Sequence, residues 1–273
     1  MSKNDIRYFV FDTESVSDGA LISRIHYPGE ALSPAEAIAR WRKELLAEKG
    51  KDFIPYTFQI PSAVVLAKVS ENYDLVDIVG LGEASYAPHE IVERFWRGWE
   101  AYNRPTFVTF NGRGFDIPLM ELAAFRYGVT IPGWYSPYAK SYDQPRNRYN
   151  TTYHIDVSDF LTNFGATQFA GGLNLAANLL GKPGKMDVQG CMVQDMHDQG
   201  QLQEIEDYCR CDVLDTYFVF LRSRVLQGFL SLAEEQQRVN SARAWIEQRA
   251  DSNIGYKTYL ENWGDWVNPW VEN

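Results

Sequence analysis

Three short acidic segments that lie far apart in the chain constrain its fold more than any other feature. They are FVFDTE at residues 9–14, NGRGFD at residues 111–116 and YCRCD at residues 208–212. The first two follow or end apolar, β-rich runs, and the third lies in a stretch with helical periodicity. If the three segments serve one purpose, the fold must carry acids on two strands and a late helix toward one another.

The rest of the sequence predicts strands that alternate with helices. Strands are expected at residues 6–11, 62–69, 73–81, 105–110 and 153–157, and helices at residues 34–49, 89–102, 117–127, 173–180, 202–226 and around Trp245. This order is typical of an α/β fold with a mixed five-stranded sheet flanked by helices. The two closely spaced early strands favour antiparallel pairing at one edge.

The length of 273 residues and the apolar content of 45% suffice for one large domain. We predict a domain over residues 1–227, in which the polar segment 17–60 is an insertion after the first strand. Residues 228–273 are expected to form a C-terminal helical extension, with a tryptophan-bearing tail, packed on the same domain. Inside the insertion, Ser33-Pro34-Ala35-Glu36 is typical of a helix start, and Gly50 of a helix end.

The charge and the cysteines narrow the class of protein. A net charge of −10 argues against a protein that only binds nucleic acid, whereas divalent metals could neutralise carboxylates in an enzyme that acts on phosphodiesters. No apolar run approaches the roughly 20 residues that span a bilayer, so we expect no membrane contact. Three cysteines favour the reducing cytoplasm, and Cys191, Cys209 and Cys211 would make a poor zinc site.

Asp12 and Glu14 are two residues apart at a predicted strand end. Because strand side chains alternate, both carboxylates point to one side and Thr13 to the other. Two converging carboxylates beside a buried strand repel each other unless a cation lies between them. The alternative is a strand that has simply emerged into solvent, and Asp-x-Glu alone does not decide between the two.

The other two segments also allow ordinary interpretations. Asp116 follows a glycine-rich turn at a predicted helix start, where an acidic residue is a common cap. Tyr208 and Asp212 are four apart and therefore share one face of a helix. Asp207 and Asp215 lie nearby, and the local sequence gives no reason to prefer either of them to Asp212.

Taken together and in this order, the motifs resemble those of the DEDDy class of 3′–5′ exonucleases, which have an RNase H-like fold. In particular, they resemble the proofreading domain of family-B DNA polymerases and the stand-alone predicted exonucleases related to it. The resemblance covers roughly residues 6–226. The segment 17–60 and the C-terminal extension depart from that pattern, and no polymerase domain fits in the chain.

The resemblance implies a two-metal mechanism that shortens single-stranded DNA from its 3′ end and releases nucleoside 5′-monophosphates. Two divalent metal ions, Mg²⁺ or Mn²⁺, would be held by four carboxylates, those of Asp12, Glu14, Asp116 and Asp212. Tyr208 would orient the attacking water. Thr13, Asn111 and Phe115 would contact the terminal nucleotide.

Two other functions stay open on the sequence. One is an exoribonuclease of the same class, since no residue here can be identified as a reader of a 2′-hydroxyl. The other is a non-catalytic nucleic-acid-binding scaffold. A polymerase or repair partner is possible, and the sequence does not identify one.

Some basic and aromatic residues are candidates for substrate contact. Residues 134–153 combine six aromatic side chains with three cations, which suits single-stranded nucleic acid or equally a packed loop. Lys182 and Lys185 could meet a phosphate or lie in a solvated turn. His154 and Asp156, two apart on a predicted strand, are more simply explained as structural than as part of a site.

Overall fold

The computed structural model describes residues 5–82, 85–184 and 192–270. At its centre lies one five-stranded sheet in the order β3-β2-β1-β4-β5. The strands are β1 (Ile6–Ser17), β2 (Gln59–Ser70), β3 (Leu75–Gly80), β4 (Thr106–Thr109) and β5 (His154–Asp156). β1, β2 and β3 pair antiparallel, whereas β4 pairs parallel with both β1 and β5. The predicted mixed five-stranded α/β sheet is confirmed.

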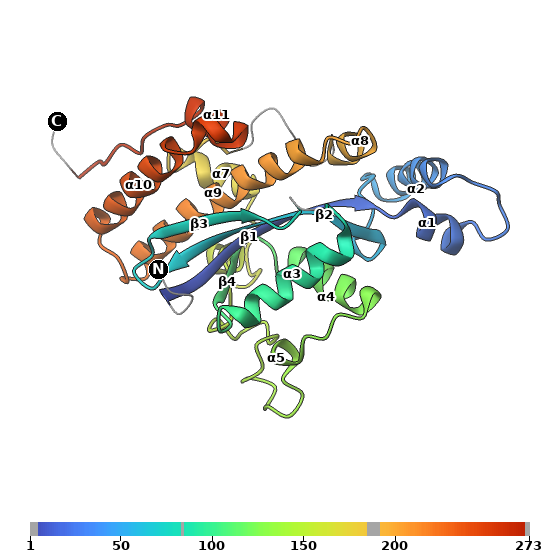
Figure 1. Cartoon of the computed structure of the whole chain (residues 1–273), viewed down its shortest axis with the longest axis horizontal. Helices are drawn as coiled ribbons and strands as arrows, with labels where there is room; N and C mark the ends of the chain where they lie inside the picture. Colours follow the sequence, from blue (N-terminus) through green and yellow to red (C-terminus); the bar gives the residue numbers. More distant parts are fainter. Residues whose placement is uncertain (1–4, 83–84, 185–191, 271–273) are drawn as a thin grey trace.

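Helices cover both faces of the sheet (Figure 1). One face carries α9 (Leu202–Leu226), with α7 (Gly172–Asn178), α10 (Leu232–Glu247) and α11 (Ile254–Glu261) packed around it. The other face carries α3 (Pro88–Ala101), α4 (Asp116–Tyr127) and the short α5 (Pro132–Tyr135). The alternation of side chains along β1 explains the two layers, because Val10 packs under α9 while Phe9 and Phe11 pack toward α3.

The segment between β1 and β2, which the sequence analysis predicts to be an insertion, forms a lobe at one end of the molecule (Figure 1). It contains α1 (Gly19–His26), α2 (Pro34–Lys49) and the turn η2 (Tyr56–Phe58) around a small core that includes Trp41 and Ile54. The predicted helix start is confirmed: Ser33 caps α2 in a capping box with Glu36, and Gly50 ends the helix at φ 68°. A salt bridge of 2.6 Å from Arg126 of α4 to Asp18 ties the lobe to the rest of the molecule.

The prediction that the first strand ends at Phe11 is wrong. β1 continues to Ser17, because β2 pairs with it as far as Ser17 opposite Gln59. Asp12 and Glu14 therefore lie inside a strand rather than at its end. The polar residues that follow Phe11 gave no local strand signal, and only the partner strand explains why they are extended.

Several short helices also escaped the sequence analysis. They are α1, α5, α11, α6 (Val157–Thr162) and α8 (Val193–Asp198), and none is longer than eight residues. Helices this short present too few turns for an apolar period to be visible. The long α9, in contrast, has the predicted bounds. Among the described residues, no helix is both long enough and apolar enough to cross a membrane.

Candidate active site

The centre of β1 is open on the side of β4. β4 pairs with β1 only from Tyr8 to Val10, while β1 runs on past that point beside β2 alone. Asp12 and Glu14 thus lie beyond the carboxyl end of β4, where the chain turns away into the loop that leads to Asp116. Such an edge, where neighbouring parallel strands end, is a common place for a binding site in α/β proteins.

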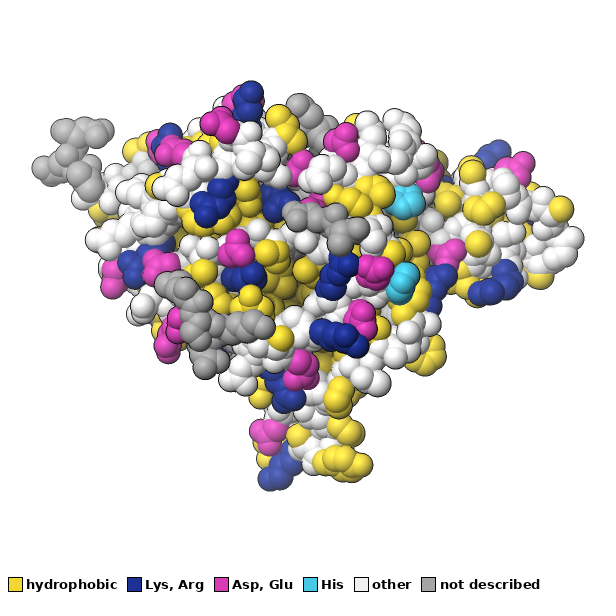
Figure 2. Space-filling view, viewed as in Figure 1, with side chains coloured by type: hydrophobic (Ala, Val, Ile, Leu, Met, Phe, Trp, Pro, Cys, Tyr) yellow, Lys and Arg dark blue, Asp and Glu magenta, His cyan; other side chains and the backbone are white. Residues whose placement is uncertain are grey.

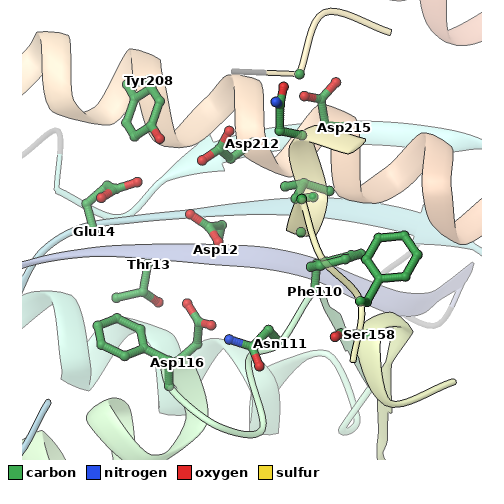
Figure 3. A pocket seen from close by; sticks show the side chains of 17 residues that line it. Asp12, Thr13, Glu14, Phe110, Asn111, Asp116, Ser158, Tyr208, Asp212 and Asp215 are labelled. Carbon is green, nitrogen blue, oxygen red and sulfur yellow. The ribbon is translucent and has the colours of Figure 1, made fainter. Parts of the chain in front are cut away.

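Side chains from three elements converge at this edge (Figure 3). Asp12 and Glu14 point toward α9, from which Tyr208 and Asp212 project to meet them. Thr13 points to the other side of β1, toward Asp116 at the start of α4. The predicted alternation along the strand and the shared helix face are both seen in these directions.

The loop that delivers Asp116 is fixed by Asp156 of β5. The backbone N–H groups of Asn111 and Arg113 each donate to the Asp156 carboxylate at 2.8 Å. Asn111 has a φ of 65°, and a Cβ at Gly112 would lie 2.5 Å from Cβ of Thr109, so the turn requires glycine there. Asp156 therefore has a structural role in shaping this loop.

His154 is structural as well. It lies on the same strand as Asp156, and its Nε2 lies 2.8 Å from the hydroxyl of Thr109 on β4. Burial lowers its pKa well below the usual value, with a further contribution from the charge of Arg113. A neutral, buried imidazole that joins two strands fits the structural interpretation of this residue.

All eight residues that the sequence analysis singled out line one cavity of about 540 Å³. They are Asp12, Thr13, Glu14, Asn111, Phe115, Asp116, Tyr208 and Asp212. Oxygens of Asp12 and Glu14 and the thiol sulfur of Cys209 all lie within 4.8 Å of one another. The cavity is thus an acidic hollow between β1, α4 and α9, and it has the volume of a small-molecule site.

Two carboxyl groups at this site, those of Asp12 and Asp116, have raised pKa values. Burial and the charge of Asp116 raise the pKa of Asp12 well above its usual range, and the Cys209 thiol only partly opposes this shift. Burial also raises the pKa of Asp116 to about 7; the charge of Asp156 adds to the shift, while polar groups of Thr13 oppose it. Acids so placed have a strong affinity for positive charge.

Tyr208 is buried next to these acids. Burial is the largest cause that raises the pKa of its phenol far above the usual value, followed by the charges of Asp212, Glu14 and Asp12. The hydroxyl therefore stays protonated throughout the range in which proteins are stable. It can donate a hydrogen bond into the cavity, but it is unsuited to accept a proton as a base.

Asp215 belongs to the same cavity, and the sequence analysis had not singled it out. It lies seven residues after Tyr208, two turns along the same face of α9, and this spacing is the signal that would have found it. Its carboxylate accepts a hydrogen bond of 2.7 Å from Tyr259 of α11, and burial raises its pKa to about 8. Asp207 lies elsewhere, where it accepts from Asn253 at 2.8 Å.

One wall of the cavity was not predicted at all. It comes from the segment between β5 and residue 184, whose contributions are Ser158, Phe169, Gly171, Gly172, Leu173, Asn174 and Gly184. Most of these residues are small or apolar and carry no chemical signature in the sequence. Only the tertiary fold, which packs α7 against α9, places them opposite the acids.

The other substrate candidates differ in burial, and most of those in residues 134–153 are exposed. Trp134 and Arg146 both bind the buried carboxylate of Glu121, at 2.7 Å each, whereas Tyr138 and Tyr149 of the same loop are exposed. The two expectations for Lys182, a phosphate contact and a solvated turn, are both wrong. Its ammonium is buried 3.8 Å from the centre of the Trp263 ring, and it donates to Gly264 O at 2.9 Å. Lys185 and Cys191 lie outside the described residues.

A comparison with known proteins identifies the family of the chain. Residues 51–263 match the family described as predicted 3′–5′ exonucleases related to the exonuclease domain of PolB. The match spans most of the chain and includes Asp116, Tyr208 and Asp212, whereas Asp12 and Glu14 precede it. No curated protein matches the chain. The chain therefore belongs to this exonuclease family, and the sheet with its flanking helices is consistent with an RNase H-like fold.

Proposed function

We propose that this member of the family is a metal-dependent exonuclease of the DEDDy class that acts on single-stranded DNA. It would hydrolyse phosphodiester bonds from the 3′ end and release nucleoside 5′-monophosphates. The observation that carries the proposal is the convergence of Asp12, Glu14, Asp116 and Asp212, with Tyr208, at one cavity. Residues 1–227 would form the exonuclease domain, and residues 228–273 an extension on it.

The donor set fits two divalent metal ions. Asp12, Glu14, Asp116 and Asp212 offer the hard oxygen ligands that Mg²⁺ and Mn²⁺ prefer, and Asp12 lies between the other carboxylates (Figure 3). The raised pKa values of Asp12 and Asp116 support the fit, because a bound cation would favour the ionised carboxylates that burial, and to a lesser degree the neighbouring negative charges, disfavour. When bound, such ions supply the positive charge that favours an attacking water and a leaving oxygen.

The remaining residues would position the substrate and the water. Tyr208, protonated, would donate a hydrogen bond that orients the attacking water relative to the scissile phosphate. Asn111 and Phe115, on the loop that Asp156 fixes, would contact the terminal nucleotide. Thr13, next to Asp116, would offer polar contacts on the same side of β1.

We expect the protein to bind single-stranded nucleic acid only transiently. On the face shown in Figure 2, Lys and Arg side chains are scattered among Asp and Glu instead of forming one basic stripe. The net charge of −10 is also opposite in sign to the basic excess that non-catalytic binders use for affinity. The cytoplasm is the proposed compartment, since Cys209 and Cys211 are buried free thiols.

The test uses 5′-labelled single-stranded DNA and RNA of matched sequence, incubated with the purified protein and Mg²⁺, Mn²⁺ or EDTA. We expect a metal-dependent ladder that shortens DNA from its 3′ end, absent with Asp12→Ala. Faster shortening of RNA would identify an exoribonuclease instead. Binding of either strand without cleavage under any metal would favour the scaffold function.

A further inference from the structure

A second cavity of about 310 Å³ adjoins the candidate active site on the side of the insertion. Thr13, Glu14 and Phe115 line both cavities, so the two lie side by side at the acidic centre. The far wall of the second cavity comes from the insertion, through Arg42 of α2 and Phe53 of the segment that follows it. A nucleic-acid strand bound at the carboxylates would therefore have this second space next to it.

Two aromatic rings stand at the junction of the cavities. Phe53 and Phe115 have ring centres 6.0 Å apart and planes inclined at 53°. Phe53 is 60% exposed, although the small core of the insertion lies immediately beside it at Ile54. A single exposed phenylalanine is common on protein surfaces, but this one lines a cavity next to the acidic centre, where its ring offers a flat face on which a base can stack.

The second cavity is also lined by a cation, Arg42. Arg42 is half-buried, and within the described part of the chain its guanidinium forms no ion pair with a carboxylate. The acids that line this cavity are Glu14, which belongs to the candidate metal site, and Asp52, which is exposed. Arg42 is therefore available to a phosphate group, which guanidinium groups bind well.

We propose that the second cavity is a nucleobase-binding subsite supplied by the insertion. A base next to the scissile phosphate would stack on Phe53 and Phe115, and the adjoining phosphate would meet Arg42. The inference rests on the proposed function, because it assumes that the substrate is a nucleic-acid strand. It gives the segment 17–60 a role in holding unpaired strands, since a base in a duplex has no free face to offer.

The experiment compares Phe53→Ala and Arg42→Ala with two matched controls in the full-length protein. Phe125→Ala removes another exposed phenylalanine, on α4, and Lys43→Ala removes the exposed cation next to Arg42; neither lines the cavity. Binding of a fluorescent single-stranded oligonucleotide is measured by anisotropy in EDTA, so that no strand is cut. Cleavage is measured separately with Mg²⁺.

We expect Phe53→Ala to weaken oligonucleotide binding by about 5- to 100-fold, the worth of one stacked base. In cleavage it should raise KM and leave kcat nearly unchanged, and Phe53→Trp should restore binding. An oligonucleotide with an abasic site at each of the last three positions in turn locates the base. At the position that stacks, the loss caused by Phe53→Ala should disappear.

The outcomes separate this inference from the proposed function. If the wild type cleaves DNA and Phe53→Ala binds and cleaves like Phe125→Ala, the subsite is refuted and the exonuclease stands. If the wild type cleaves nothing but Phe53→Ala still weakens base-dependent binding, the subsite stands and the exonuclease assignment fails. If the wild type neither binds nor cleaves any strand, both are refuted.

Discussion

The thiol of Cys209 on α9 lies 3.3 Å from the backbone oxygen of Asp12 on β1 and 3.7 Å from its carboxylate. This contact joins residues that are 197 positions apart in the chain, and it lies next to the acids of the site. Cys209 is fully buried, and burial raises its pKa well above the usual value, so it acts as a small neutral side chain. The spacing between Asp12 and the acids of α9 therefore depends on the size of residue 209.

Enlarging this residue should separate the helix from the strand. We expect Cys209→Leu to destabilise the fold by about 1–3 kcal/mol through overpacking and to lower cleavage by at least about tenfold. Cys209→Ala keeps the side chain small and should retain most activity. Thermal unfolding and initial rates check both variants. Full activity of Cys209→Leu would show that the site tolerates a wider gap.

Removal of Asp12 should abolish catalysis without unfolding the protein. We expect Asp12→Ala to reduce cleavage at least about a thousandfold, because a carboxylate that would hold the metal ions is lost. Relief of carboxylate repulsion should keep its melting temperature in EDTA at or above that of the wild type. Calorimetric titration with Mn²⁺ should show weakened binding. Asp251→Ala, an exposed acid far from the cavity in sequence, is the control, and wild-type turnover of Asp12→Ala would refute the site.

Tyr208 should contribute less than the carboxylates. We expect Tyr208→Phe to reduce kcat roughly 10- to 100-fold, the effect of one orienting hydrogen bond. Burial and the neighbouring acids raise the pKa of this phenol, so it stays protonated. The rate of the wild type should therefore not fall at alkaline pH through ionisation of Tyr208. If the profile of the wild type has an alkaline limb that Tyr208→Phe lacks, the phenol titrates and its role is different.

Local signals account for what the sequence predicted well. Ser33, Glu36 and Gly50 define α2 by capping chemistry, and α9 is a long run without glycine or proline that lies between Gly200 and Gly228. The order of strands followed from apolar runs separated by turn residues. Asp12 and Glu14 were singled out only together with the segments at residues 111–116 and 208–212, because Asp-x-Glu alone does not separate a site from a strand that has emerged into solvent.

Non-local interactions account for what the sequence missed. The extension of β1 to Ser17 depends on pairing with β2, which begins more than forty residues later along the chain. Asp215 shares the helix face of Tyr208 by its spacing, but only the packing of α9 on the sheet shows that this face lines the cavity. Lys182 lies buried against Trp263 because the C-terminal tail folds back on it, a contact across 82 residues. No local pattern encodes such an arrangement.

The metal-free site should become less stable as the pH rises. Asp116 has a pKa of about 7 in the fold, against about 4 when unfolded. A raised carboxyl pKa means that the native state binds more protons, so this contribution to stability is complete below pH 4 and is lost as the pH rises to 7. In EDTA, the stability of Asp116→Asn relative to the wild type should therefore rise by about 2 kcal/mol between pH 5 and pH 8.

Bound metal should oppose this loss of stability at high pH, and more so in the wild type than in Asp116→Asn. Bound Mg²⁺ or Mn²⁺ favours the ionised carboxylates, so it should raise the melting temperature of the wild type more at pH 8 than at pH 5, and that of Asp116→Asn much less. Denaturant unfolding at each pH, with EDTA or with metal, measures both effects, and Asp251→Asn controls for the loss of a surface charge. If the difference in stability between Asp116→Asn and the wild type stays constant from pH 5 to pH 8 in EDTA, Asp116 is ionised in the metal-free protein. Its raised pKa would then no longer support a bound cation at this site.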